Sequence, residues 1–210
     1  MEPLNLYKVK KRRTRRLVIF ILIFISVTSF FLYTEYGKKV SAFVLKNQPV
    51  GFVTDSFNGV KVYSNGRNFA QSYGSHYAAD GFYYGKKWQC VEFVKRYYYD
   101  YLHHKMPDGY GNAKDFWNAD IKNGELNKVR NLLQFENNST SKPEINDLVI
   151  FPYSKYGHVA IISKVENKSV EIIQQNIYGM PRELYDLSFI NGKYSVSKGE
   201  RKPIGWLRKK

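Results

Sequence analysis

The feature that most constrains this chain is the uncharged run over residues 17–33, which is dominated by Leu, Ile, Val and Phe. At about 1.5 Å of rise per residue, a helix of this length lies at the short end of the range that spans a bilayer. A globular domain must then be built from the residues that follow the run.

Residues 1–16 precede the run and carry seven Lys and Arg side chains against one Glu. A cleaved signal peptide, a buried core helix and an uncleaved signal anchor all fit the run by length. A core helix rarely lacks a polar face, and the bulky Phe30-Phe31-Leu32-Tyr33 does not resemble a small-residue cleavage site. We therefore expect a single transmembrane signal anchor at 17–33, a basic cytoplasmic tail at 1–16 and an outer C-terminal part.

Residues 34–50 show no sustained period and are expected to form a linker, followed by one domain at 51–210. The single cysteine allows no internal disulfide, so the core alone must hold this domain. The net charge of +15 suits an anionic wall polymer or membrane surface, with nucleic acid as the competing partner. We expect no nucleic acid, because we find no zinc-ligand spacing, helix-turn-helix signature or glycine-rich phosphate loop.

Periodicity predicts an α+β domain with one helix region packed on an antiparallel sheet. The helix is expected at about 89–103, after a loop at 77–85. The stretch 127–136 fits either a strand or an irregular segment. Apolar alternation and turn signals predict strands at 60–63, 147–151, 158–165, 169–176, 184–190, 193–196 and 204–207.

The lone cysteine lies at the start of the predicted helix. Its apolar positions are Cys90, Phe93, Val94, Tyr97 and Tyr101, which share one face. Unpaired N–H groups and the helix dipole in the first turn favour a thiolate, as in reactive cysteines. The alternative is a buried structural cysteine.

A thiolate nucleophile needs a base. His158 opens an apolar strand, and Gln174 and Asn176 end the strand expected to pair with it in a hairpin. Side-chain alternation puts Gln174 and Asn176 on one face and turns Gln175 away. An amide oxygen there can accept the Nδ1 proton of His158 and leave Nε2 facing the sulfur. The spacing thus permits a Cys–His–amide site. The alternative is a structural histidine at the start of a strand.

Three motifs carry a resemblance to a known family: Lys87-Trp88-Gln89-Cys90-Val91-Glu92-Phe93, Gly157-His158-Val159-Ala160-Ile161-Ile162 and Gln175-Asn176. Together they resemble the CHAP family of cysteine- and histidine-dependent amidohydrolases and peptidases. Within it, the likeness is to the amidase domain of bifunctional glutathionylspermidine synthetase/amidases, over residues 52–208. The resemblance implies a papain-like (CHAP, NlpC/P60-like) α+β cysteine hydrolase fold.

The resemblance also implies roles for single residues. Cys90 is the nucleophile, His158 the general base and acid, and Gln174 stands where the family usually has Glu. Asn176 shares the orienting role. Backbone N–H groups at the helix start should hold the oxyanion.

Two further residues are candidates at the oxyanion and substrate-binding site. Gln89 is either a second oxyanion donor or a loop-packing amide, and Trp88 either lines the groove or belongs to the core. No metal and no cofactor are expected.

Three functions fit these residues. The first is a membrane-anchored amidase or endopeptidase at the bacterial cell membrane, with its outer domain acting on peptidoglycan peptides. The second is an amidase for a glutathionylspermidine-like polyamine conjugate. The third is an inactive CHAP domain that binds wall or serves as a scaffold, which the Gln at position 174 motivates.

Overall fold

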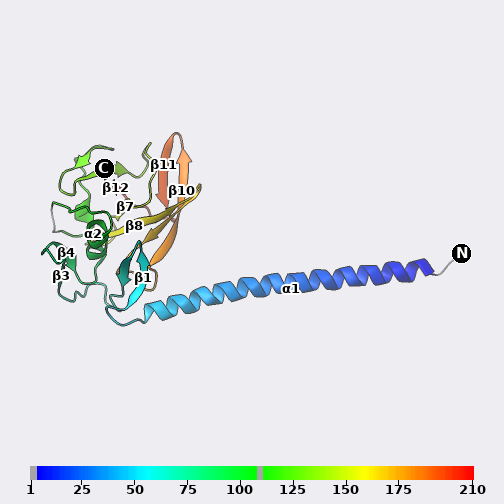
Figure 1. The fold of residues 1–210 in the computed structure, drawn as a ribbon. Coiled ribbons are helices and arrows are strands. Elements are labelled where there is room, and N and C mark those ends of the chain that lie inside the picture. The colour runs from blue at the N-terminus through cyan, green and yellow to red at the C-terminus, as the bar shows by residue number, and fades with distance from the viewer. Residues whose placement is uncertain (1–3, 108–110) are drawn as a thin grey trace. The chain divides into compact units, whose positions relative to one another are not determined.

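The computed structural model describes residues 4–107 and 111–210, without the side chains of residues 4–14 (Figure 1). The chain forms two compact units, Met1–Val44 and Leu45–Lys210, which we describe separately. Most side chains of the expected basic tail, 1–16, therefore lie outside the described part.

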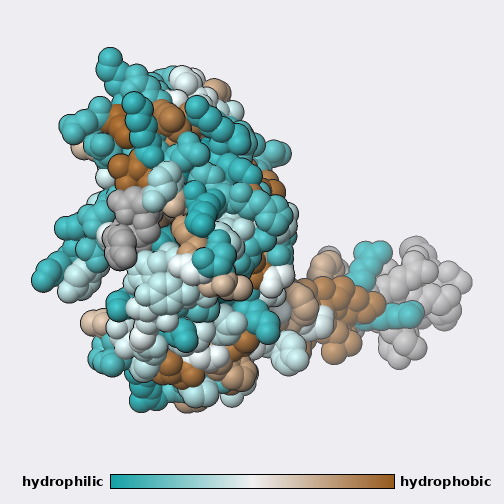
Figure 2. Space-filling view, turned by 60° about the vertical axis from the view of Figure 1, so that its left-hand side comes forward, coloured by the Kyte–Doolittle hydropathy of each residue, from teal (hydrophilic) through white to brown (hydrophobic). Residues whose placement is uncertain are grey.

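The first unit consists of helix α1, Leu4–Lys46. From Arg15 to Lys46 it is long and apolar enough to cross a membrane by length and composition, with a mean hydropathy of 2.5 in its most apolar window. A signal sequence near the N-terminus passes the same test. Figure 2 shows hydrophobic side chains along the visible part of α1, and a mainly hydrophilic face on the second unit.

Helix α1 continues through residues 34–46, where the sequence suggested a linker without regular structure. That stretch contains no proline, and its one glycine, Gly37, costs a helix only about 1 kcal/mol. An ion pair between Glu35 and Lys38, 2.6 Å apart and one turn along the helix, agrees with the helical conformation.

The second unit is an α+β domain with one α-helix and an eight-stranded antiparallel sheet of order β11-β10-β9-β8-β7-β12-β6-β5. Two short hairpins, β1–β2 and β3–β4, lie outside this sheet. The elements are β1 Val53–Phe57, β2 Val60–Tyr63, β3 Ser75–Tyr77, β4 Tyr83–Lys86, α2 Cys90–Asp100, the 3₁₀ helix Ala113–Phe116, β5 Leu126–Asn127, β6 Leu132–Glu136, β7 Leu148–Phe151, β8 His158–Val165, β9 Ser169–Ile173, β10 Arg182–Ile190, β11 Lys193–Ser197 and β12 Gly205–Arg208.

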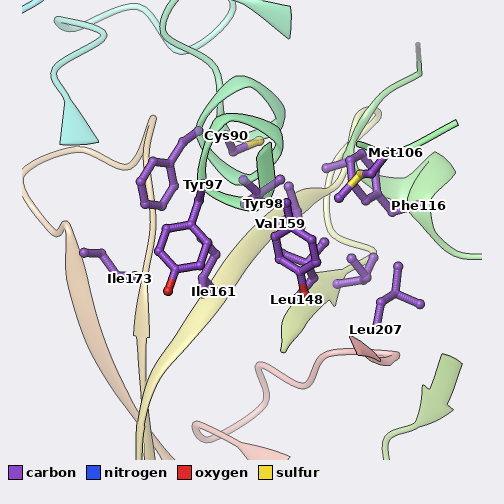
Figure 3. Close-up of a cluster of buried hydrophobic side chains, with 14 of the residues drawn as sticks. Cys90, Tyr97, Tyr98, Met106, Phe116, Leu148, Val159, Ile161, Ile173 and Leu207 are labelled. Carbon is purple, nitrogen blue, oxygen red and sulfur yellow. The ribbon is translucent and has the colours of Figure 1, made fainter. Parts of the chain in front are cut away.

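Strand β7, near the middle of the sheet, is apolar along its whole length because both of its faces are buried. Leu148 and Ile150 of β7 belong to the cluster beneath α2, whereas Val149 and Phe151 belong to a second cluster on the opposite face. Figure 3 shows Tyr97 and Tyr98 of α2 directed toward the sheet residues Ile161 and Leu148. The helix with Cys90 is thereby fixed against β7 and β8.

Helix α2 is shorter at its C-terminal end than expected, ending at Asp100 rather than near 103. His103 has a left-handed backbone with φ of 50°. The N–H of His104 bonds to the carbonyl of Tyr98, 2.8 Å away, so the chain folds back over the end of the helix. The expected loop at 77–85 contains the start of a short strand, β4, which pairs with β3.

Candidate active site

Cys90 is the first residue of α2, as its periodicity predicted, and Gln89 is the N-cap. The thiol is buried, with 8% of the residue exposed. Burial raises the pKa of Cys90, and hydrogen bonds from the N–H groups of Val159, Val91 and Cys90 itself only partly offset this. The expectation that the helix start favours a thiolate is therefore corrected, because desolvation outweighs the dipole and its N–H groups.

Cys90 and Val159 belong to the same buried cluster, so the beginning of β8 lies against the start of α2. His158, the first residue of β8, directly precedes Val159. The Nε2 atom of His158 lies 3.0 Å from the Oε1 atom of Gln174. This reverses the expected use of the ring nitrogens, since Nε2 and not Nδ1 meets the amide. Within residues 4–107 and 111–210, no hydrogen bond joins the sulfur to the imidazole.

The hairpin geometry brings Gln174 to His158. Strands β8 and β9 are antiparallel, and Ile161 is opposite Ile173. Gln174, the next residue, is therefore a diagonal neighbour of His158 on the same face. It is 1% exposed and its N–H bonds to the carbonyl of Pro181 at 2.9 Å.

Burial also lowers the pKa of His158 to about 4. The Gln174 hydrogen bond and the charge of Glu183 raise it, and the charge of Arg201 lowers it. With the Cys90 pKa raised and the His158 pKa lowered, the pair is a neutral thiol and a neutral imidazole near pH 7.

Asn176 does not take the expected place at His158. Strand β9 ends at Ile173, and Asn176 has a left-handed φ of 64°, so strand alternation does not extend to it. Its Nδ2 instead donates to Phe69 O at 2.9 Å and Gln89 Oε1 at 2.5 Å, and its Oδ1 accepts from Asn65 at 2.9 Å.

Gln89 is held by this loop cluster. Its Nε2 donates to the carbonyls of Phe69 at 3.1 Å and Gln71 at 2.7 Å, which occupies both amide protons. This geometry favours the loop-packing interpretation over the oxyanion-donor interpretation. Trp88 packs on Tyr63, with ring centroids 4.1 Å apart, and on His76 at 5.4 Å, so it is a half-buried wall of this loop region.

A buried polar network lies behind Cys90 and was not predicted from the sequence. Glu92, fully buried, accepts from Arg96 at 2.6 Å and Gln175 at 2.7 Å, and lies 2.8 Å from His76 Nδ1. Gln175 also donates to the carbonyl of Gln89, 3.0 Å away. The network joins the end of β9 to the start of α2. The one sequence signal for it is the oppositely charged pair Glu92 and Arg96 at i, i+4 spacing on the predicted helix.

The described residues contain no group of three or more His, Cys, Asp or Glu side chains placed to hold a metal ion. The chemical groups of the candidate site are the buried thiol of Cys90 at a helix start, the imidazole of His158 at a strand start, and the amide of Gln174 that fixes this imidazole. This set defines a candidate site for nucleophilic acyl transfer on an α+β domain.

Comparison with known proteins agrees with this class. Residues 79–176 match the family model of the CHAP domain. The matched segment includes Cys90, His158, Gln174 and Asn176. A CHAP domain indicates hydrolase activity of the amidase or peptidase type.

Two similar curated proteins bear related names. A glutathionylspermidine synthase of Crithidia fasciculata is 33% identical over 101 residues, 44% of this chain and 14% of the relative. A bifunctional glutathionylspermidine synthetase/amidase of Escherichia coli K12 is 29% identical over 143 residues, 61% of this chain and 23% of the relative. The similar region thus spans less than a quarter of either relative.

Proposed function

We propose that the protein is a membrane-anchored cysteine amidase or endopeptidase that hydrolyses amide bonds in peptidoglycan peptides. The observation that supports it most is that Cys90 and Val159 belong to the same buried cluster, because Val159 directly follows His158 and this brings the start of the histidine strand to the helix with the thiol. The fold is then papain-like, with the nucleophile on a helix and the base on a sheet.

The mechanism begins from the neutral pair. As the Cys90 sulfur attacks the amide carbonyl, its proton passes to Nδ1 of His158, and Gln174 Oε1 accepts from Nε2 of the resulting imidazolium. His158 then gives the proton to the leaving amine. Water hydrolyses the thioester with His158 again as base, which releases the acid and restores the thiol.

The oxyanion is held by the backbone N–H groups of Cys90 and Val91. Both belong to the first turn of α2, where N–H groups have no partner within the helix. Gln89 serves this pocket indirectly, by keeping the loop at Phe69 and Gln71 in place.

The substrate and location rest on charge and topology. An anchor at 17–33 holds the domain next to the cell wall, with residues 1–16 cytoplasmic by the positive-inside rule. Residues 17–210 carry +9 of the net charge of +15, because residues 1–16 hold seven Lys and Arg against one Glu, and this positive charge favours contact with anionic wall polymers.

The test uses the full chain in detergent micelles, incubated with purified peptidoglycan and followed by mass spectrometry of the soluble fragments. Wild type should release fragments that carry one new amine and one new carboxyl end at a single type of bond. Cys90→Ala and His158→Gln should release none. Equal release by wild type and Cys90→Ala would refute the proposal.

A polyamine conjugate is a second candidate substrate, favoured by the names of the similar proteins. Release of spermidine from glutathionylspermidine by wild type and not by Cys90→Ala, with peptidoglycan left intact, would select it. A third candidate, an inactive wall-binding or scaffold module, is favoured by Gln174. Binding to peptidoglycan without cleavage of either substrate would select that one.

A further inference from the structure

The side-chain amide of Gln174 can present either its oxygen or its NH₂ group to His158, and only the oxygen leaves Nδ1 of His158 able to act as a base. With Oε1 toward His158, the ring donates from Nε2 and keeps its lone pair on Nδ1. With the amide turned over, NH₂ would face the ring and Nε2 would have to accept. The neighbours of the far end of the amide decide which orientation is stable.

Both neighbours at that end are acceptors. Gln174 Nε2 donates to the carbonyl of Met180 at 3.0 Å and lies 3.4 Å from Oε2 of Glu183. A reversed amide would set its oxygen against this carbonyl and this carboxylate. The reversal is disfavoured because it leaves three oxygens facing one another in a buried place.

Glu183, on β10, is itself firmly held. Its side chain is 4% exposed, and Oε1 accepts from Lys198 at 2.9 Å and Arg201 at 2.7 Å. Burial raises the pKa of Glu183, but the hydrogen bonds and charges of Lys198 and Arg201 outweigh it and hold the pKa below its ordinary value. The group is therefore a carboxylate at neutral pH.

We propose that Glu183 is a positioning residue that fixes the Gln174 amide, so that His158 carries its proton on Nε2 and presents Nδ1 to Cys90. The CHAP resemblance leads one to expect a carboxylate at position 174. In this protein the carboxylate belongs to Glu183, which acts on His158 through Gln174. The catalytic meaning of this relay rests on the proposed function.

The charges around His158 give the proposal a second readout. Glu183 of β10 and Arg201 of the segment after β11 both act on the charge of the ring, and the Tyr185 hydroxyl of β10 lies 3.4 Å from Glu183 Oε2. Glu183 raises the His158 pKa and Arg201 lowers it. Removing either charge should therefore shift the titration of the same ring in opposite directions.

The experiment is ¹⁵N NMR of the full chain in micelles with labelled histidine, where the His158→Gln spectrum identifies the His158 signals. Wild type should show the Nε2–H tautomer. Glu183→Ala should show both tautomers, whereas Glu183→Gln keeps an acceptor and should retain the wild-type tautomer. Glu171→Gln, which removes a carboxylate paired with Arg182 on the same sheet, is the matched control and should change nothing.

The titrations complete the test. The His158 pKa should be lower in Glu183→Gln and higher in Arg201→Ala than in wild type. If amide hydrolysis is detected, kcat/KM of Glu183→Ala should fall about 10- to 100-fold, the usual cost of removing a group that orients a reactive side chain.

The NMR readout does not depend on activity, so the relay and the function fail separately. A folded Glu183→Ala chain with the wild-type tautomer and titration would overturn the relay, even if the enzyme is active. If wild type shows the Nε2–H tautomer and Glu183→Ala loses it, the relay is supported. This conclusion holds even if the protein cleaves neither substrate.

Discussion

His158 Nε2 lies 3.0 Å from Gln174 Oε1, so the side chain that orients this histidine is a neutral amide. A neutral partner does not stabilise an imidazolium as a carboxylate does. Together with the burial of Cys90 and the partial burial of His158, it explains why the Cys–His pair is neutral in this structure.

Exchanging the side chains of Gln174 and Glu183 is an independent test of the proposal that Glu183 fixes the Gln174 amide. Gln174→Glu alone should destabilise the domain, because the new carboxylate meets the Met180 carbonyl and the carboxylate of Glu183. Adding Glu183→Gln should recover most of the lost stability and raise the His158 pKa, since the charge now adjoins the ring. Urea unfolding of wild type, the two single variants and the double variant gives the coupling free energy between positions 174 and 183. Simple additivity would contradict the arrangement.

Acid should destabilise the domain through His158. The ordinary histidine pKa is 6.5 and the folded value is about 4, so between these values the unfolded chain binds more protons. The free energy of unfolding should fall as the pH drops from 6.5 to 4, by at most about 1.4 kcal/mol per unit. His158→Gln should remove this part of the slope, which urea unfolding at several pH values measures. An unchanged slope would count against a buried neutral His158.

Asn176 combines a left-handed backbone with an amide that holds Gln89. Asn176→Ala should lower the free energy of unfolding by about 1–2 kcal/mol from the backbone alone, with the lost hydrogen bonds in addition. Asn176→Gly has no backbone strain, so its loss of stability reports only the missing hydrogen bonds of the amide. The difference between the variants in urea unfolding separates the two effects. Equal destabilisation would show that the left-handed backbone is not retained.

Glu92 supports the start of α2. Glu92→Gln should destabilise the domain by about 3–5 kcal/mol, because it leaves Arg96 as an uncompensated buried charge. Glu166→Gln, which breaks the exposed pair with Lys164, is the control and should leave the unfolding midpoint unchanged. Similar midpoints for the two variants would mean that the Glu92 network contributes no stability.

The sequence was sufficient for local features of the site. The helical period placed Cys90 in a first turn, and the apolar strands with a turn between them predicted the hairpin that brings Gln174 to His158. Both rest on regular geometry, which period and turn signals report directly.

Features that depend on the whole packed domain were not predictable in this way. Asn176 departs from the strand pattern because β9 ends at Ile173. The raised Cys90 pKa needs the extent of burial, and the contact of Glu183 with Gln174 crosses between strands β9 and β10 at a turn. Gln175 and Glu92 lie 83 positions apart, so no local pattern connects them.

The most direct test of the account is a trapped acyl-enzyme. The full chain in micelles is mixed with peptidoglycan fragments or glutathionylspermidine, quenched in acid within milliseconds to seconds, and weighed by intact-protein mass spectrometry with peptide mapping. We predict a transient thioester on Cys90, absent from Cys90→Ala and from His158→Gln. Hydrolysis of the same amide by Cys90→Ala at the wild-type rate would contradict a cysteine nucleophile.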